Sequence, residues 1–336
     1  MTYINYMSNS YNGHLCIVFA LEHYNPLNMI RAFGENGINP VYISVKRRYE
    51  VACRSKYISK LHRVDSVEEG YKLLMAEYGN MEKKPYIVFS DDKSVGYFDL
   101  HYDEWKDKFI TYNAGRVGRI NEFMDKYNIQ QLAKKHGFNV LDSYVIGKED
   151  PLPEQLWYPI ITKDISPNSG SWKGDVFVCQ NEEELKESIK KITSPLIMIQ
   201  HFVDKQNEMA LEGYTINRGK DMQIITQMTW KYLIQGYYSP FHNVCMFTDK
   251  EMEHKLQAMF EEIGFEGVFE VEFLIDKDGT FYFMETNFRA SAWNPTCKFA
   301  GMPLDYLWVK GMENGYIDPA DRRVFEPFTS MSEVID

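Results

Sequence analysis

A predicted β-hairpin carries the residues of this chain that are best suited to chemistry. Residues 278–279, Asp-Gly, favour a two-residue turn, because both central positions of such a turn need positive φ. The flanking segments, 268–275 and 280–286, are rich in β-branched and aromatic residues, which is typical of strands. In this register Glu272 lies directly opposite Glu285, whereas a loop of odd length would break the pairing.

The same register places a set of polar side chains on one face of the hairpin. Two opposed carboxylates have Cβ atoms roughly 5 Å apart and repel each other, so they need a proton, a basic neighbour or a cation. Two carboxylates and an amide oxygen form a hard-oxygen set that suits Mg²⁺, with Mn²⁺ as an alternative. A hairpin whose acidic side chains merely face solvent is the other interpretation of this pattern. The residues expected on this face are Glu270, Glu272, Glu285 and Asn287, with Leu274 and Phe283 further along it.

Two runs in the hairpin, 272–279 (Glu-Phe-Leu-Ile-Asp-Lys-Asp-Gly) and 285–289 (Glu-Thr-Asn-Phe-Arg), resemble the metal-binding hairpin of the ATP-grasp superfamily. This superfamily includes D-alanine–D-alanine ligase, biotin carboxylase and the carbamoyl phosphate synthetase large chain. The resemblance implies a metal site made of Glu272, Glu285 and Asn287. It also implies that Arg289 is catalytic and meets the phosphates of ATP and the tetrahedral oxyanion.

Two lysines stand where the superfamily places phosphate-binding lysines. Lys126 belongs to an Asp-Lys pair inside a helix predicted over 121–137, and Lys163 ends a strand predicted over 158–163. The resemblance implies that both bind the phosphates of ATP and that Lys163 is also catalytic. The loop 164–174 is then the candidate lid, although it has fewer glycines than the superfamily pattern. A solvated lysine and a plain hairpin loop are the alternatives. The loop residues expected at the phosphates are Ser169, Gly170 and Ser171.

The adenine site is expected where the strand predicted over 196–203 runs into a hinge. Backbone donors and acceptors can read the edge of adenine there, and Gln200 stands where the superfamily often has Glu. The resemblance implies that Glu208 binds the ribose and that Lys231 reaches the phosphates. Ordinary packing at a strand end is the alternative for the hinge residues. The hinge residues expected at the adenine are Gln200, His201, Phe202 and Val203.

The acceptor substrates are expected near two further segments. One is the aromatic segment 232–244, which contains Tyr238, and the other is 290–297, which contains Ser291 and Trp293. These residue types are compatible with an amino acid, a peptide end or a sugar-linked acid, and they do not choose among them.

The elements that must position these residues follow from the pattern of apolar runs. Short apolar runs at 14–20, 40–45 and 85–90 alternate with helical segments at 26–37 and 66–78, which predicts a parallel sheet with helical crossovers. The phosphate-loop motifs G-x-G-x-x-G and G-x-x-x-x-G-K-[ST] are both absent. We therefore predict a mixed α/β and α+β protein with a Rossmann-like parallel-sheet domain and a two-lobed ATP-grasp core. In this core the nucleotide lies between two antiparallel sheets. The predicted divisions are 1–115 for the first domain, 116–200 for the small lobe and 201–336 for the large lobe.

Composition narrows the classes of partner. The 336-residue chain has a formal net charge of −11, which argues against a general nucleic-acid or anionic-membrane surface. Its five scattered cysteines form no C-x-x-C pair, which disfavours a disulfide framework or a zinc site. No secretory signal or apolar run of the ~20 residues needed to cross a bilayer is visible. We expect a cytoplasmic protein that acts on small molecules, without nucleic-acid or membrane partners, and leave a homodimer open.

The resemblance implies an ATP- and Mg²⁺-dependent ligase that forms C–N bonds. Such an enzyme activates a carboxylate as an acyl phosphate, joins it to an amine or another nucleophile, and releases ADP and phosphate. A phosphotransferase that stops at phosphoryl transfer, and a nucleotide-binding protein without turnover, are the alternatives.

Overall fold

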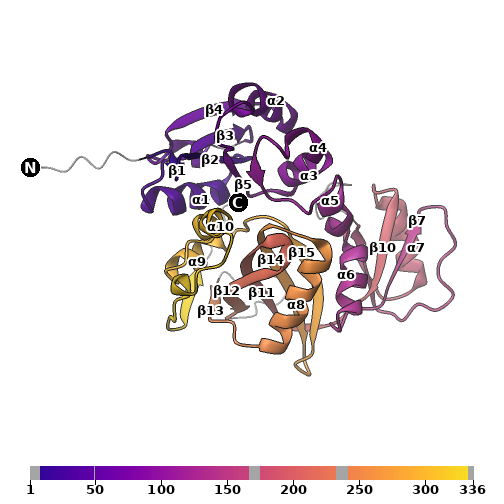
Figure 1. The fold of residues 1–336 in the computed structure, drawn as a ribbon. Helices are drawn as coiled ribbons and strands as arrows, with labels where there is room; N and C mark the ends of the chain where they lie inside the picture. Colours follow the sequence, from indigo (N-terminus) through magenta and orange to yellow (C-terminus); the bar gives the residue numbers. More distant parts are fainter. Residues whose placement is uncertain (1–7, 49, 166–174, 232–240, 332–336) are drawn as a thin grey trace, which may run out of the picture.

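Three sheets follow one another along the chain in the computed structural model, which describes residues 8–48, 50–165, 175–231 and 241–331. Figure 1 shows the first sheet at the top, the second at the right and the third below. None of the helices described is long and apolar enough to cross a membrane.

The first sheet is parallel and has helices packed on it. Its strand order is β4-β3-β2-β5-β6, and β1 adds an antiparallel edge to β2. The inner strands are short apolar runs whose side chains are buried on both faces, as expected for a parallel sheet. The strands are β1 Ser10–Tyr11, β2 His14–Leu21, β3 Val41–Val45, β4 Lys60–Val64, β5 Tyr86–Phe89 and β6 Ile110–Thr111. The helices are α1 Tyr24–Glu35, α2 Val67–Tyr78, α3 Asp92–Leu100 and α4 Tyr102–Trp105, with a 3₁₀ turn at Ala52–Arg54.

The predicted parallel sheet is confirmed, and its caps explain where two helices begin. The side chain of Ser66 accepts from the N–H of Glu69 at the start of α2, and Asp91 accepts from the N–H of Ser94 at the start of α3. The strands β4 and β6 and the helices α3 and α4 were not predicted. The sequence of β4 is mostly polar because this strand forms the exposed edge of the sheet.

The second sheet is small and antiparallel, with strand order β7-β10-β8-β9. Helix α7, Glu182–Lys191, covers one of its faces and shares with it a separate apolar core that includes Ile160, Leu185 and Ile197. Its strands are β7 Ser143–Gly147, β8 Ile160–Asp164, β9 Val178–Cys179 and β10 Leu196–His201. We call this unit the small lobe.

The third sheet is large and antiparallel, with strand order β15-β14-β11-β12-β13-β16. Its strands are β11 Lys205–Ile216, β12 Asp221–Trp230, β13 Phe241–Cys245, β14 Gly267–Asp276, β15 Phe281–Asn287 and β16 Phe328–Met331. Its helices are α8 Lys250–Ile263, α9 Asn294–Phe299 and α10 Leu304–Asn314, with 3₁₀ turns at Asn217–Gly219 and Pro319–Asp321. In the tail after residue 319, the strand β16 extends the sheet by pairing with β13. We call this unit the large lobe.

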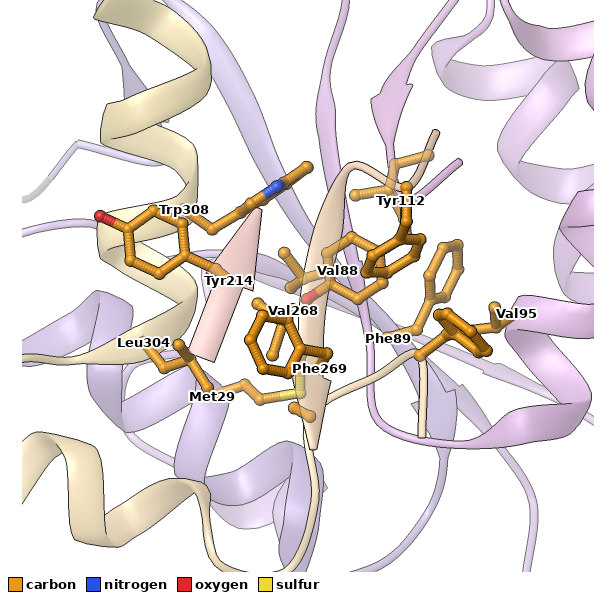
Figure 2. Close-up of a cluster of buried hydrophobic side chains, with 14 of the residues drawn as sticks. Met29, Val88, Phe89, Val95, Tyr112, Tyr214, Val268, Phe269, Leu304 and Trp308 are labelled. Carbon is orange, nitrogen blue, oxygen red and sulfur yellow. The ribbon is translucent and has the colours of Figure 1, made fainter. Parts of the chain in front are cut away.

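One continuous apolar core joins the first sheet to the large lobe, whereas the small lobe has its own core. Figure 2 shows side chains from both sides of this joint, including Phe89 of the first sheet and Phe269 of the large lobe. Trp308 of α10 is fully buried within it, with its ring centroid 4.9 Å from that of Tyr112. The first sheet and the large lobe are therefore packed as one body.

The helix predicted over 121–137 is wrong in one respect, because the chain forms two helices there. Helix α5, Arg119–Met124, ends before Asp125, and α6, Lys126–Lys135, begins after it. Asp125 has extended backbone angles, and its side chain accepts from the N–H of Asn128 as the N-cap of α6. The break makes Lys126 the first residue of a helix.

The hairpin β14–β15 has the predicted pairing at its functional end but a different turn. Glu272 lies opposite Glu285 and Glu270 opposite Asn287, as predicted. The turn has three residues rather than two, since the N–H of Asp276 donates to the carbonyl of Thr280. Of these three residues only Gly279 has positive φ, as in a type I turn followed by a left-handed residue.

A bulge in β15 offsets the odd-length turn. The register shifts between Glu272 and Phe273, so that Met284 is the extra residue and Phe273 pairs with Phe283. The prediction that Phe283 shares the face of the two carboxylates is therefore wrong, because Phe283 lies on the opposite, fully buried face. Leu274 does share their face, opposite Tyr282.

Candidate active site

The paired strands β14 and β15 bring two carboxylates and an amide together on one face. The Nδ2 group of Asn287 donates to Glu272 Oε1 and to Glu270 Oε2, each at 3.0 Å. Burial, and then the charges of Glu285 and Glu270, raise the pKa of Glu272 well above its usual value. The negative charge on this face is therefore not fully neutralised by other residues of the hairpin.

The first residue of α6 supplies a cation to this face. The Nζ of Lys126 lies 3.1 Å from Glu285 Oε2. This ion pair raises the pKa of Lys126. Burial acts to raise the pKa of Glu285, but Lys126, Lys163 and Arg289 outweigh burial and hold it below its usual value. Both side chains of the pair are therefore charged at neutral pH.

Arg289 joins the hairpin to the first sheet. Its guanidinium lies 3.2 Å from Asp92 Oδ1, at the first residue of α3, and 3.5 Å from Glu270 Oε2, and it donates to Asn287 Oδ1 at 3.1 Å. Burial acts to lower its pKa, but Asp92 and Glu270 outweigh burial and raise it. Arg289 thus stays charged and fixes the oxygen side of the Asn287 amide.

Lys163 reaches the site from the small lobe. It lies in β8, and its Nζ donates to Gln200 Oε1 at 3.0 Å. Burial lowers the pKa of Lys163 to about 8, although Glu285 acts in the opposite direction. The amide of Gln200 is 1 % exposed and donates in turn to Gln130 Oε1 at 2.9 Å. The side chain predicted to read adenine is therefore turned inward, onto a lysine.

The hinge after β10 leaves backbone donors for a ligand, as far as the described residues show. The N–H of His201 donates to the carbonyl of Asp142, and that of Phe202 donates to the carbonyl of Pro159. Within the described part of the chain, the N–H of Val203 has no acceptor. On β8, Ile161 shares the face of Lys163 and provides an apolar surface near the hinge.

Two other predicted ATP-binding residues differ in how close they lie to this cluster. Glu208 shares the face of Glu272 on the neighbouring strand β11, pairs with Lys205, and acts on the pKa of both Glu272 and Lys163. Lys231 follows β12, and its Nζ donates to Thr329 of β16, at the edge of the sheet opposite the hairpin. The structure brings Glu208 to the cluster and does not bring Lys231 there.

Of the predicted substrate residues after the hairpin, Ser291 is buried and Trp293 is half-buried. Ser291 is 2 % exposed and hydrogen bonds to Glu212 Oε1, while its Oγ accepts from the N–H of Trp293. The Trp293 ring packs against His242, with centroids 4.0 Å apart. The remaining predicted residues, Ser169, Gly170, Ser171 and Tyr238, lie outside the described residues.

The donor set fits a hard divalent cation. Among the described residues there is no cluster of three or more His, Cys, Asp or Glu side chains that could hold a metal ion. The predicted set is instead two carboxylates, Glu272 and Glu285, and the oxygen of Asn287, which here accepts from Arg289 while the Asn287 nitrogen faces Glu272. The side chain of Glu272 accepts from an uncharged amide, that of Asn287, and burial and then the nearby carboxylates raise its pKa, so a cation would stabilise its charged form. A set with so small a number of protein ligands is suitable for Mg²⁺, because this ion keeps waters and phosphate oxygens in its other coordination positions.

Several residues of the site could not be found from the sequence. Gln130 lies inside α6 and Asp92 at the start of a helix that was not predicted, and neither belongs to a motif. Glu212 lies opposite Glu270 on β11, fully buried, and only the register of β11 with β14 reveals it.

The order of the three sheets defines the fold class of the protein. A parallel-sheet domain followed by two antiparallel lobes is the architecture that the resemblance to the ATP-grasp superfamily implied. Solved structures confirm this resemblance for the fold. An L-amino acid ligase from Bacillus licheniformis superposes with a TM-score of 0.71 at 12% identity, over 94% of this chain and 78% of that chain. A biotin carboxylase from Campylobacter jejuni, solved with β-γ-ATP, has a TM-score of 0.70 at 17% identity, over 94% of this chain and 74% of the carboxylase chain.

Sequence comparison identifies a related enzyme over part of the chain. A D-alanine–D-alanine ligase from Fusobacterium nucleatum is 28% identical over 172 residues, which are 49% of this chain and 55% of the ligase. The chain spans about half the length of the curated relatives it matches. No protein-family model matches the chain.

Proposed function

We propose that this protein is an ATP- and Mg²⁺-dependent ligase that joins a carboxylate to an amine or another nucleophile, with release of ADP and phosphate. The observation that carries the proposal is the convergence of three cations on the carboxylates of one hairpin. Lys126 lies 3.1 Å from Glu285, Arg289 lies 3.5 Å from Glu270, and Lys163 raises the local positive potential from the small lobe. Such a site neutralises the charge of a polyphosphate.

Within this proposal the nucleotide lies between the small-lobe sheet and the large-lobe sheet. The N–H of Val203, which has no acceptor among the described residues, would meet the edge of the adenine, and Glu208 would meet the ribose. The divisions at residues 115/116 and 200/201 are part of the proposal. The change of sheet between β6 and β7 supports the first, whereas the second falls inside β10, and the change of sheet supports a boundary between β10 and β11 instead. Lys231 is supported less well than the other residues, because it lies toward the far edge of the sheet.

The chemical steps need positioning and charge neutralisation rather than a protein nucleophile. The substrate carboxylate attacks the γ-phosphorus of ATP, the bond to the β–γ bridging oxygen breaks, and an acyl phosphate and ADP result. Lys126 and Lys163 hold the phosphate oxygens in line for this attack. Bound at Glu272, Glu285 and Asn287, Mg²⁺ would neutralise the phosphate charge. The amine then attacks the acyl carbon, phosphate leaves, and Arg289 stabilises the oxyanion.

A screen for ADP release tests the proposal. The protein is incubated with ATP, Mg²⁺ and pairwise mixtures of amino acids and sugar acids, and ADP and phosphate are measured. We expect release that requires a carboxylate and an amine together. A stable phosphorylated product would identify a phosphotransferase instead, and tight ATP binding without ADP would identify a nucleotide-binding protein without turnover. Failure to bind ATP at all would remove the whole proposal.

A further inference from the structure

A buried chain of side-chain amides links the small-lobe lysine to the hairpin. Lys163 Nζ donates to Gln200 Oε1 at 3.0 Å, Gln200 Nε2 donates to Gln130 Oε1 at 2.9 Å, and Gln130 Nε2 donates to the carbonyl of Met284 at 2.9 Å. Both glutamines are 1 % exposed. The two amides therefore link β8 and β10 through α6 to β15 with almost no exposure to bulk water.

The two ends of this chain fix the orientation of both amides. An ammonium group can only donate and a backbone carbonyl can only accept. Gln200 must therefore present its oxygen to Lys163 and its nitrogen to Gln130. Gln130 must in turn present its nitrogen to Met284. Each link has one direction, so neither glutamine can rotate its amide without leaving a buried polar group unpaired, which is costly.

The acceptor at the hairpin end is the carbonyl of the bulge residue. Met284 is the extra residue of β15, and it directly precedes Glu285. A bulge locally interrupts the ladder of hydrogen bonds between two strands, which leaves a backbone group for another partner. The amide chain thus ends one residue from the carboxylate that pairs with Lys126.

We propose that Gln200 and Gln130 are positioning residues, which hold the ammonium of Lys163 at a fixed place relative to Glu285 and leave its positive charge unneutralised. This inference rests on the proposed function, in which Lys163 binds phosphate. A carboxylate at position 200 would also accept from Lys163, but it would form an ion pair that an incoming phosphate has to displace. A neutral amide provides the same geometry and leaves the whole charge for the anion.

The charge state of Lys163 agrees with a neutral partner. Burial lowers its pKa to about 8, and the charges that act against burial are those of Glu285, Glu208 and Glu272 on the large lobe. A carboxylate in direct contact would favour the protonated form more strongly than an amide does.

The test measures the titration of Lys163 directly and does not depend on turnover. The full-length protein, without nucleotide, is acetylated competitively between pH 6.5 and 10.5, and the labelling of each lysine is followed by mass spectrometry. We expect Lys163 to titrate near pH 8 in the wild type. In Gln200→Glu we expect a midpoint higher by about one pH unit or more. The exposed Gln180→Glu, which adds the same charge elsewhere on the small lobe, is expected to leave the midpoint unchanged.

Binding of Mg²⁺·ADP to the same proteins, measured by calorimetry, supplies a second readout. Gln200→Glu is expected to weaken ADP binding about tenfold, because a rise of one unit in the pKa of Lys163 corresponds to a tenfold change in an equilibrium constant with which the phosphate must compete. Gln130→Leu is expected to weaken ADP binding several-fold. Should Gln200→Glu lose its cooperative unfolding transition, Gln200→Met replaces it, and its Lys163 midpoint is expected to fall. An unchanged Lys163 midpoint in a folded Gln200 variant would overturn the inference. Loss of ADP binding by the wild type would overturn the proposed function but leave the titration interpretable.

Discussion

At Glu285, burial and three nearby cations act in opposite directions. Burial alone would favour the neutral acid, whereas Lys126, Lys163 and Arg289 keep the carboxylate charged. A group held charged in this way can accept a metal ion without first losing a proton. Glu272 has the reverse balance, since burial and its acidic neighbours raise its pKa. The two carboxylates of the hairpin are therefore not equivalent, and a cation is needed more by Glu272.

Substitution of Glu285 by Gln tests the metal role at the residue scale. The change keeps the shape of the side chain and removes its charge, so we expect turnover to fall by more than about a hundredfold. The unfolding transition should stay cooperative. Glu251→Gln, at an exposed position on α8, is the matched control and should keep full activity. Near-normal turnover of Glu285→Gln would rule out its proposed role.

The pKa of Lys163 predicts a pH dependence of nucleotide binding. Lys163 is charged below about pH 8 and neutral above it, and a bound phosphate favours the charged form. We therefore expect the dissociation constant for ADP to rise about tenfold per pH unit above pH 8, until Lys163 in the complex also titrates. Calorimetry between pH 6.5 and 9.5 measures this. Lys163→Met should bind ADP more weakly and lack the inflection; an inflection that persists would assign it to another group.

At the scale of single elements, Asp125 sets where α6 begins and hence where Lys126 stands. Replacing Asp125 by Ala removes the acceptor of the Asn128 N–H, and we expect a loss of about 1 kcal/mol in the free energy of unfolding. ADP binding should weaken as well, because Lys126 loses its fixed position. Denaturant unfolding and calorimetry measure the two effects. Asp125→Asn, which keeps a cap, should restore most of both, and equal losses in the two variants would argue against the capping role.

The elements differ in how far the sequence predicts them. The pairing of Glu272 with Glu285 was predicted, although the turn that led to it was not formed. In the folded chain the side chain of Asp276 accepts from the N–H groups of Asp278 and Thr280, which stabilises the three-residue turn. The break between α5 and α6 has a similar cause, since the cap at Asp125 competes with continuation of the helix. The periodicity of hydrophobic residues does not reveal local hydrogen bonds of this kind.

At the scale of the whole molecule, the cores divide the protein differently from the sheets. The first sheet and the large lobe share one core, and the small lobe has another. Alternating strands and helices predicted the first sheet, and the resemblance to the ATP-grasp superfamily implied the other two. No local pattern could show that α10, late in the chain, packs against the first sheet (Figure 2). The contact between Arg289 and Asp92, which spans the same joint, was equally hidden.

Two large-to-small substitutions distinguish these cores. Trp308→Ala should cost about 3–5 kcal/mol and weaken amide protection in β5 and β11 together, because both strands share the core of Trp308. Leu185→Ala, in the small lobe, should cost about 2–5 kcal/mol and weaken protection in β10 while β5 is unchanged. Hydrogen exchange followed by mass spectrometry measures both patterns. Equal loss of protection in all three strands would show that the protein unfolds as a single unit.

The extra residue at Met284 constrains how the β14–β15 ribbon can change length. Side chains alternate along a strand, so a ribbon that gains or loses one residue reverses the faces of everything beyond that point. A three-residue turn is compatible with Glu272 facing Glu285 only while the bulge is kept. Shortening the turn alone would turn an apolar residue toward the face that carries the carboxylates, whereas shortening the turn and deleting the bulge together would preserve the face. Insertions and deletions in this ribbon should therefore occur in compensating pairs.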